Sequence, residues 1–231
     1  DAERAVLATL DLAGQDVSVD WAEKEGWAGE ADVPSRLFHW ESFAPPIEPS
    51  EPYTLQWFLA IEHQRHGRSA RWIPHLLEFT RHAGDTLLGL GSGLGTDWLQ
   101  YARHGAKVIA CSPVAAELAL IRRNFELRNL KGRFTQAEPT DLPLADASVD
   151  VACLSGVLHE AADPQAVVRE VHRVLRPGGK VLAVVPAKYS IDWWRPGERS
   201  VWSGSPLRSK SACPPITTFS ARRLRKLFAG F

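Results

Sequence analysis

From about residue 86 onward, two patterns of apolar residues alternate along the chain: short continuous runs and helical spacing. The short runs are typical of buried strands, and in the segments between them apolar residues recur every three or four positions. Strands interleaved with helices indicate an α/β fold, with a mainly parallel sheet and helices on both faces. The pattern predicts strands at 86–90, 107–111, 133–136, 150–154 and 180–185, and helices at 96–104, 114–128, 164–174 and 220–229.

Three further regions depart from this alternation. Residues 1–52 are acidic and interrupted by prolines, which predicts an arm with limited helix, anchored by aromatic side chains. Residues 53–79 have a helical pattern broken near Gly67 and Pro74, which predicts a lid or cap beside a ligand cleft. Residues 187–215 are rich in Trp, Pro, Ser and Arg, and two interpretations stay open: a substrate lid, or a packed aromatic loop without ligand contact.

A glycine-rich turn follows the first predicted strand. Gly91, Gly93 and Gly95 let the backbone turn sharply and approach a ligand closely, with Ser92 between them. Backbone N–H groups at the start of the next helix would face that ligand. The spacing weighs against the dinucleotide fingerprint G-x-G-x-x-G, because Thr96 stands where its third glycine would fall. The turn therefore indicates a nucleotide-like cofactor.

The segment 88–95 resembles the first motif of class I S-adenosylmethionine-dependent methyltransferases, an acid-x-G-x-G-x-G turn after strand one. Further segments resemble later motifs of that family in the expected order: 105–110, 137–144, 148–151, 156–159 and 173–179. The resemblance covers roughly residues 53–231 and is closest to methyltransferase type 11-like domains. It implies a Rossmann-like class I fold, with S-adenosylmethionine as the cofactor.

Two acids of that family are absent at the matching positions. Gly89 stands where an acid orients the amino-acid end of the cofactor, and Cys111, followed by Ser112, stands where an acid takes the ribose hydroxyls. Cysteine is a poor acceptor, although Ser112, a backbone carbonyl or water could bond the ribose. Losing two charge-assisted hydrogen bonds would weaken cofactor binding by about a hundredfold or more. We expect Gly89→Glu combined with Cys111→Asp to tighten binding.

The resemblance also implies contacts further along the chain. Glu138 matches an acid that accepts a bond from the adenine amino group, with a solvated loop carboxylate as the alternative. His159 would lie near the methyl acceptor as a general base or an orienting group, or be a loop histidine satisfied locally. Asp97 is expected to cap the next helix or complement its dipole. The cofactor-binding residues expected from the resemblance are Gly91, Ser92, Gly93, Gly95, Cys111, Ser112 and Glu138.

Composition narrows the class of protein. With 231 residues the chain suffices for one domain and a terminal extension. Its 27 basic and 27 acidic residues give no global support for nucleic-acid binding. Three widely spaced cysteines without a C-x-x-C pair argue against a disulfide framework or a zinc site. No apolar stretch approaches the ~18 residues that span a bilayer, and we expect a cytoplasmic protein.

Charge is distributed unevenly. Residues 1–62 hold thirteen acids and three bases, whereas residues 187–231 hold nine bases and two acids. The acidic start either lies near the basic end or in solvent, or forms a surface for a protein partner. The two strands that usually end the family's sheet are not predicted, which indicates a trimmed fragment or a sheet edge that a partner covers.

Three hypotheses about function remain. The leading hypothesis is methyl transfer to a small-molecule acceptor, because the chain has no N-P-P-Y or D-P-P-Y segment and no basic stripe through the core. The alternative, favoured by Gly89 and Cys111, is a noncatalytic methyltransferase-like scaffold or assembly subunit with weak or no cofactor binding. A nicotinamide-dependent oxidoreductase is the third hypothesis, because that class of enzyme also needs an acid at the position that Cys111 occupies.

Overall fold

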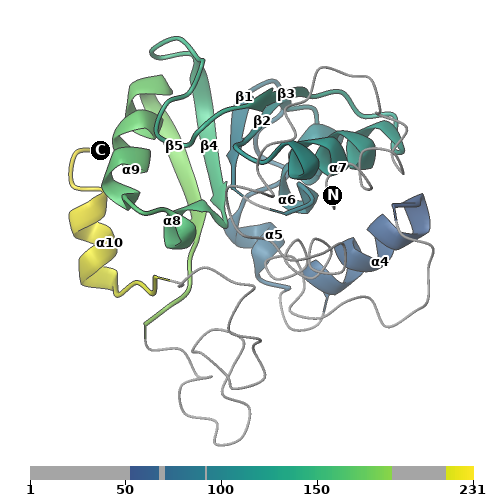
Figure 1. Cartoon of the computed structure of the whole chain (residues 1–231), viewed down its shortest axis with the longest axis horizontal. Helices are drawn as coiled ribbons and strands as arrows, with labels where there is room; N and C mark the ends of the chain where they lie inside the picture. The colour runs from purple at the N-terminus through teal and green to yellow at the C-terminus, as the bar shows by residue number, and fades with distance from the viewer. Residues whose placement is uncertain (1–52, 68–70, 92, 189–216) are drawn as a thin grey trace, which may run out of the picture.

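The computed structural model describes residues 53–67, 71–91, 93–188 and 217–231. The predicted arm at 1–52 and most of the predicted lid or loop at 187–215 lie outside these residues. The elements, labelled in Figure 1, are α4 (Leu55–Arg65), α5 (Ile73–Leu76), β1 (Thr86–Leu90), α6 (Thr96–Arg103), β2 (Lys107–Ser112), α7 (Ala115–Glu126), β3 (Arg133–Gln136), β4 (Val149–Ser155), α8 (Val157–Glu160), α9 (Pro164–Val174), β5 (Leu175–Val184) and α10 (Ala221–Leu227).

The strands form one five-stranded sheet in the order β3-β2-β1-β4-β5, and every pairing is parallel. The chain winds outward from β1 to β3 and then returns to place β4 beside β1. The winding therefore reverses between β1 and β4, and in such sheets ligands bind beyond the carboxyl ends of the strands at this switch point. The topology confirms the predicted Rossmann-like α/β fold.

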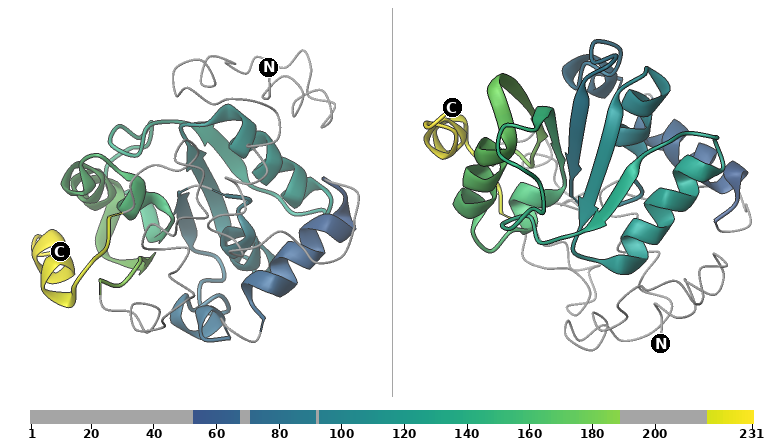
Figure 2. Two further views of the ribbon diagram at one scale, coloured as in Figure 1. Left: turned by 60° about the horizontal axis from the view of Figure 1, so that its bottom comes forward. Right: turned by 90° about the horizontal axis from the view of Figure 1, so that it is seen from above.

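Neighbouring residues of each central strand face opposite apolar layers. Leu88 and Leu90 belong to a buried cluster with residues of α9 and α10, whereas Leu87 packs with residues of α5, α6 and α7. Figures 1 and 2 show these two groups of helices on the two sides of the sheet. Because helices cover both faces of the sheet, β1 is a continuous apolar run rather than an alternating one.

Three details differ from the predicted elements. β5 begins at Leu175 instead of residue 180, because Leu175 still pairs with Val149 before an irregularity in the ladder. Gly178 lies in this segment with φ +80°, a backbone conformation that glycine tolerates. Pro74 lies in the first turn of α5 and does not break a helix, since its missing N–H is not needed in a first turn. The single turn α8 was not predicted.

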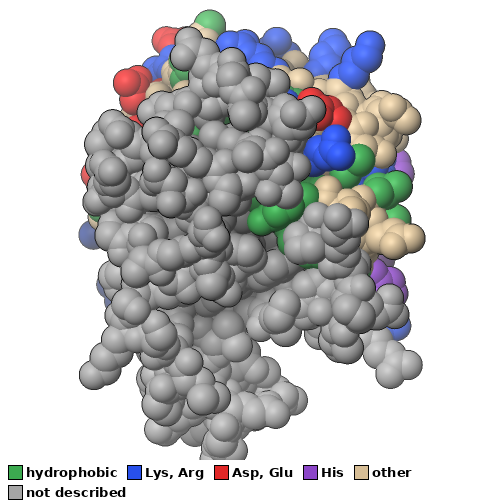
Figure 3. All heavy atoms as spheres, turned by 45° about the vertical axis from the view of Figure 1, so that its right-hand side comes forward, with side chains coloured by type: hydrophobic (Ala, Val, Ile, Leu, Met, Phe, Trp, Pro, Cys, Tyr) green, Lys and Arg blue, Asp and Glu red, His purple; other side chains and the backbone are tan. Residues whose placement is uncertain are grey.

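The described surface carries charges of both signs. On the face in Figure 3, Lys and Arg side chains lie close to Asp and Glu side chains, in keeping with the formal net charge of zero. In the part of the chain that the structure describes, no helix combines the length and the apolar character needed to cross a bilayer.

Candidate functional site

The glycine-rich turn lies at the switch point, between the end of β1 and the start of α6. Gly91, Gly93 and Gly95 all have positive φ, at +145°, +110° and +67°. A Cβ on Gly91 would lie 1.9 Å from the backbone oxygen of Ser155, the last residue of β4, and one on Gly95 would lie 2.8 Å from Cγ2 of Ile121. The turn therefore needs glycine both for its backbone angles and for its contacts with β4 and α7. Ser92 lies outside the described residues.

Gly89 has no room for a side chain. A Cβ at this position would lie 2.4 Å from Cδ2 of Trp98, whose side chain is buried against the strand. Indole atoms thus occupy the space into which an acid at this position would extend. A side chain at residue 89 and the indole of Trp98 therefore exclude each other in this packing.

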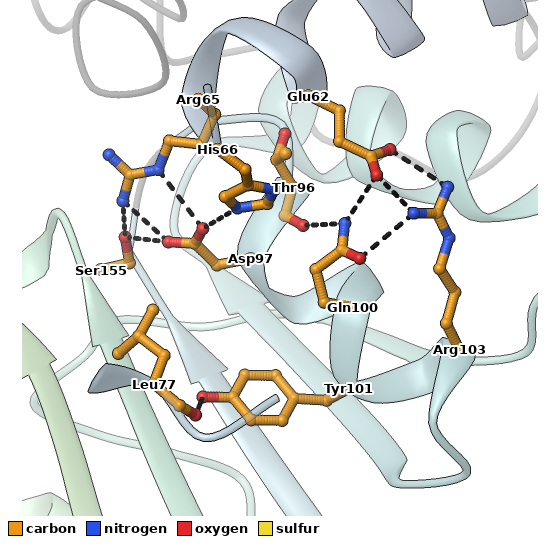
Figure 4. Close-up of polar contacts among 10 residues, drawn as sticks. All are labelled: Glu62, Arg65, His66, Leu77, Thr96, Asp97, Gln100, Tyr101, Arg103 and Ser155. Atoms are coloured by element: carbon orange, nitrogen blue, oxygen red, sulfur yellow. Dashed lines mark hydrogen bonds and ion pairs between the residues drawn. The ribbon is translucent and has the colours of Figure 1, made fainter. Parts of the chain in front are cut away.

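Asp97, in the first turn of α6, is buried in a polar network (Figure 4). Its Oδ2 accepts hydrogen bonds from Nη2 of Arg65 at 2.8 Å and from Oγ of Ser155 at 3.0 Å. Its Oδ1 lies 3.3 Å from Nε of Arg65 and 3.0 Å from Nε2 of His66. Of the two expected roles, the cap was wrong, because the residue before the helix is Gly95 and no side-chain hydrogen bond caps it. Asp97 does lie in the first turn of α6, where a negative charge complements the helix dipole. The carboxylate also joins α4, α6 and β4.

The charge of Asp97 is maintained by its neighbours. Burial alone would raise the pKa of Asp97, but Arg65 and His66 outweigh it and hold that pKa well below the usual range of a carboxyl group. The group is therefore ionised at neutral pH. A buried ion pair is costly to desolvate, so its placement at the switch point marks a candidate functional position.

Glu62 forms a second anchor between α4 and the rest of the domain. It pairs with Arg103, and its Oε1 and Oε2 accept hydrogen bonds from Gln100 and Arg128 at 3.0 Å each (the Gln100 and Arg103 contacts are drawn in Figure 4). Burial opposes ionisation, but these partners together lower the pKa of Glu62. An open pocket of about 490 Å³ runs along this helix and is lined by Leu59, Glu62, His63, His66 and Gly67. His66, a member of the Asp97 network, therefore lines this pocket.

The carboxyl end of β2 also carries a buried acid, supplied by the next helix. Cys111 is fully buried in an apolar cluster, and burial raises the pKa of its thiol to about 11. Ser112 donates a hydrogen bond from Oγ to Oε2 of Glu117 at 2.8 Å and accepts one from the backbone N–H of Val114 at 3.1 Å. Glu117 lies in the first turn of α7 and is only 5% exposed.

The sequence analysis did not single out Glu117, because the motif resemblance predicts an acid on the strand itself. A signal was nevertheless present: Glu117 is the third residue of α7. An acid at this position of a helix often reaches back toward the helix start. The preceding strand end is therefore within its range.

The other two residues expected to contact ligands, Glu138 and His159, follow the carboxyl ends of β3 and β4. Glu138 is exposed in the turn after β3. His159 lies in α8 directly after β4, is 2% exposed, and its backbone oxygen accepts a hydrogen bond from the N–H of Thr217 at 2.9 Å. Within the described ranges, no three His, Cys, Asp or Glu side chains are grouped so that they could hold a metal ion.

Comparisons with known proteins agree with this architecture. Residues 87–183 match the family model of a methyltransferase domain. The demethylmenaquinone methyltransferase of Paenarthrobacter aurescens is 28% identical over 130 residues, which are 56% of this chain and 50% of that protein. The enzyme of the same name from Clavibacter sepedonicus is 34% identical over 100 residues, 43% of this chain and 40% of that protein. The chain thus spans half the length of these relatives or less.

A solved structure shows the same fold. The S-adenosylmethionine-dependent methyltransferase from Aquifex aeolicus aligns with a TM-score of 0.53 at 20% identity, over 71% of this chain and 82% of that one. The parallel sheet, the glycine turn at its switch point and the matched family model lead to one assignment. Residues 87–183 therefore match a methyltransferase domain and have the Rossmann-like fold of class I methyltransferases.

Proposed function

We propose that the chain binds S-adenosylmethionine at the carboxyl ends of β1, β2 and β4 and directs methyl transfer to a small-molecule acceptor. The observation that carries this proposal is the glycine turn at the switch point, whose backbone is left-handed at Gly91, Gly93 and Gly95. The names of the two matched relatives support a small-molecule acceptor, since both refer to demethylmenaquinone.

The residues present fit such a cofactor. The turn places backbone N–H groups of α6 at the switch point, and carboxylates lie at the ends of β2 and β3. When bound, the cofactor supplies an electrophilic methyl group on a sulfonium centre. The chain would contribute alignment of the reactants and exclusion of water. In this assignment the contacting residues are Gly91, Ser92, Gly93, Gly95, Cys111, Ser112 and Glu138.

Titration calorimetry tests the proposal directly. We expect S-adenosylmethionine and S-adenosylhomocysteine to bind with dissociation constants in the micromolar to sub-millimolar range. The contrary outcome, no heat with either ligand at millimolar concentration, would favour a noncatalytic scaffold. The indole of Trp98 in the place of the family's acid is the observation that favours this second candidate.

His159 is the candidate for the acceptor side of the reaction, as a general base or an orienting group. We expect His159→Gln to lower the rate of methyl transfer about 100-fold and to leave the affinity for S-adenosylhomocysteine unchanged. The rate would be followed as S-adenosylhomocysteine released with a panel of quinol and phenol acceptors. His172→Gln, at an exposed position of α9, is the matched control. Equal rates for the two variants would remove His159 from the reaction.

A further inference from the structure

His66 lies where the end of α4 meets the end of β4. Its Nε2 is 3.0 Å from Oδ1 of Asp97, and Oδ2 of the same carboxylate accepts a hydrogen bond from Oγ of Ser155, the last residue of β4 (Figure 4). The backbone oxygen of Ser155 lies against the glycine turn, 1.9 Å from the place that a Cβ on Gly91 would take. The carboxylate of Asp97 therefore links the histidine ring to the switch point, where ligands of such sheets bind.

Asp97 determines which nitrogen of His66 carries the proton. The carboxylate is ionised, and an ionised carboxylate only accepts hydrogen bonds, so Nε2 donates to it. In a neutral ring the lone pair is then on Nδ1. A T-shaped contact with Phe79, 5.4 Å between the ring centroids, holds the plane of the ring. His66 is therefore oriented by two neighbours, with Nδ1 as its basic atom.

The ring does not need a positive charge to hold Asp97 in place. Arg65 already contacts both oxygens of that carboxylate, at 3.3 Å from Nε and 2.8 Å from Nη2, and a guanidinium keeps its proton in proteins. The charge of Asp97 is therefore balanced without His66. A neutral imidazole can take up a proton, and the neighbouring carboxylate would stabilise the positive charge that the ring then gains.

His66 is also within reach of a ligand. Its side chain is 14% exposed, and it lines the pocket of about 490 Å³ along α4. Leu59 gives this pocket an apolar side, whereas the carboxylate of Glu62 is already paired with two arginines. Of the lining residues that the structure describes, His66 is the base that a buried carboxylate orients.

We propose that His66 is a general base of methyl transfer, and that the pocket along α4 takes an acceptor with a phenolic or enolic hydroxyl group. This inference rests on the proposed function and specifies its acceptor. A phenol has an ordinary pKa of about 10, as the tyrosine side chain does, and is a poor nucleophile until its proton is removed. A thiol ionises more readily and gains less from a base. The charge of Arg65 disfavours a cationic ammonium group and favours an acceptor that becomes an anion.

The proposed step conserves charge and electrons. Nδ1 of His66 takes the hydroxyl proton as the acceptor oxygen bonds to the methyl carbon. The carbon–sulfur bond breaks, and its electron pair stays on sulfur, which becomes a neutral thioether. The positive charge of the sulfonium is thus replaced by that of the imidazolium, which then releases its proton to water in the open pocket. His159 keeps the orienting role on the acceptor side.

The first test needs no cofactor, because 4-nitrophenol is yellow only as its anion and its spectrum reports its protonation. In buffer slightly more acidic than its own pKa, we expect the unaltered protein to bind it as the anion. We expect His66→Gln to bind it protonated and about 10-fold more weakly. Glutamine still donates to Asp97 but takes up no proton. His75→Gln, at an exposed position of α5, is the matched control and should behave as the unaltered protein.

Methyl transfer separates a base from a residue that only supports the fold. We expect His66→Gln to lower kcat about 100-fold with weakly acidic phenols and less than about threefold with 4-nitrophenol, which ionises by itself. The dissociation constant of S-adenosylhomocysteine should not change. Equal losses with both acceptors, or a selective loss in His159→Gln instead, would overturn the inference while the proposed function stands.

A measurement on the unaltered protein decides the question if His66→Gln does not fold. In nitrogen-15 NMR of the histidine rings at neutral pH, we expect Nδ1 of His66 to carry no proton in the free protein and to gain one when 4-nitrophenol binds. A proton on Nδ1 in the free protein, or no change on binding, would contradict the inference. If neither S-adenosylmethionine nor S-adenosylhomocysteine binds, the proposed function fails and the inference fails with it.

Discussion

Asp97→Asn is expected to destabilise the protein by about 3–5 kcal/mol, because Arg65 would keep its charge in a buried position and lose its charged acceptor. The side chain of Asp97 is only 4% exposed and that of Arg65 8% exposed, with 2.8 Å between the paired atoms. An amide keeps the shape but can neither neutralise Arg65 nor accept every bond that the carboxylate accepts. The free energy of unfolding in urea measures the loss.

Glu62→Gln is the matched control, since Glu62 also anchors α4 to α6. Its side chain is 16% exposed, and two of its ionic partners are Arg103 and Arg128. Water screens this cluster better, so we expect a loss of only about 1 kcal/mol. If the two variants lost equal stability, burial would not be the reason that Asp97 matters.

The pH dependence provides a further check on Asp97. Its pKa is depressed in the folded protein, so its contribution is fully present above the ordinary carboxyl pKa and is lost as the pH falls through the folded value. The difference in unfolding free energy between the unaltered protein and Asp97→Asn should therefore be constant near neutral pH. It should shrink below about pH 4.

Gly89→Glu, which introduces the acid that the motif resemblance predicts at the end of β1, is expected to destabilise the protein by more than about 3 kcal/mol. The new Cβ alone would lie 2.4 Å from the indole of Trp98, and the carboxylate would be forced into a packed layer. We therefore expect weaker rather than tighter cofactor binding, which revises the expectation from the sequence. Urea unfolding and titration with S-adenosylhomocysteine measure the two effects.

A smaller pair of changes isolates the clash. Gly89→Ala should cost stability through the same contact with Trp98, and Trp98→Leu should cost stability through the cavity that it leaves. Because the two changes compensate in volume, the double variant should lose less than the sum of the single losses. Strict additivity, or a Gly89→Glu variant that is stable and binds more tightly, would show that Trp98 does not occupy the acid's space.

Cys111→Asp meets a similar obstacle on the other face of the sheet. Cys111 is 0% exposed and packs in the same apolar cluster as Leu88 and Leu90. An aspartate there would bury a charge among apolar side chains. The strand ends one residue later, at Ser112, whose side chain has polar partners in Glu117 and in the backbone N–H of Val114.

The sequence alone was sufficient for the order of the five strands and the position of the turn. The strands at 86–90 and 133–136 and the helix at 164–174 match their predicted bounds. These features depend on local causes: hydrophobic spacing selects strand or helix, and left-handed backbone angles select glycine. The family motifs are likewise contiguous segments, so they can be recognised without knowledge of contacts.

The polar network and the packing around the turn were decided only by the tertiary structure. Arg65 reaches Asp97 from a helix 32 residues earlier, and Ser155 reaches it from a strand 58 residues later. Trp98 fills the space beside Gly89 because the turn folds α6 back onto β1. Such contacts depend on how separate elements pack together. The sequence shows that residue 89 is a glycine, but it does not show that the side chain of Trp98 fills the space beside it.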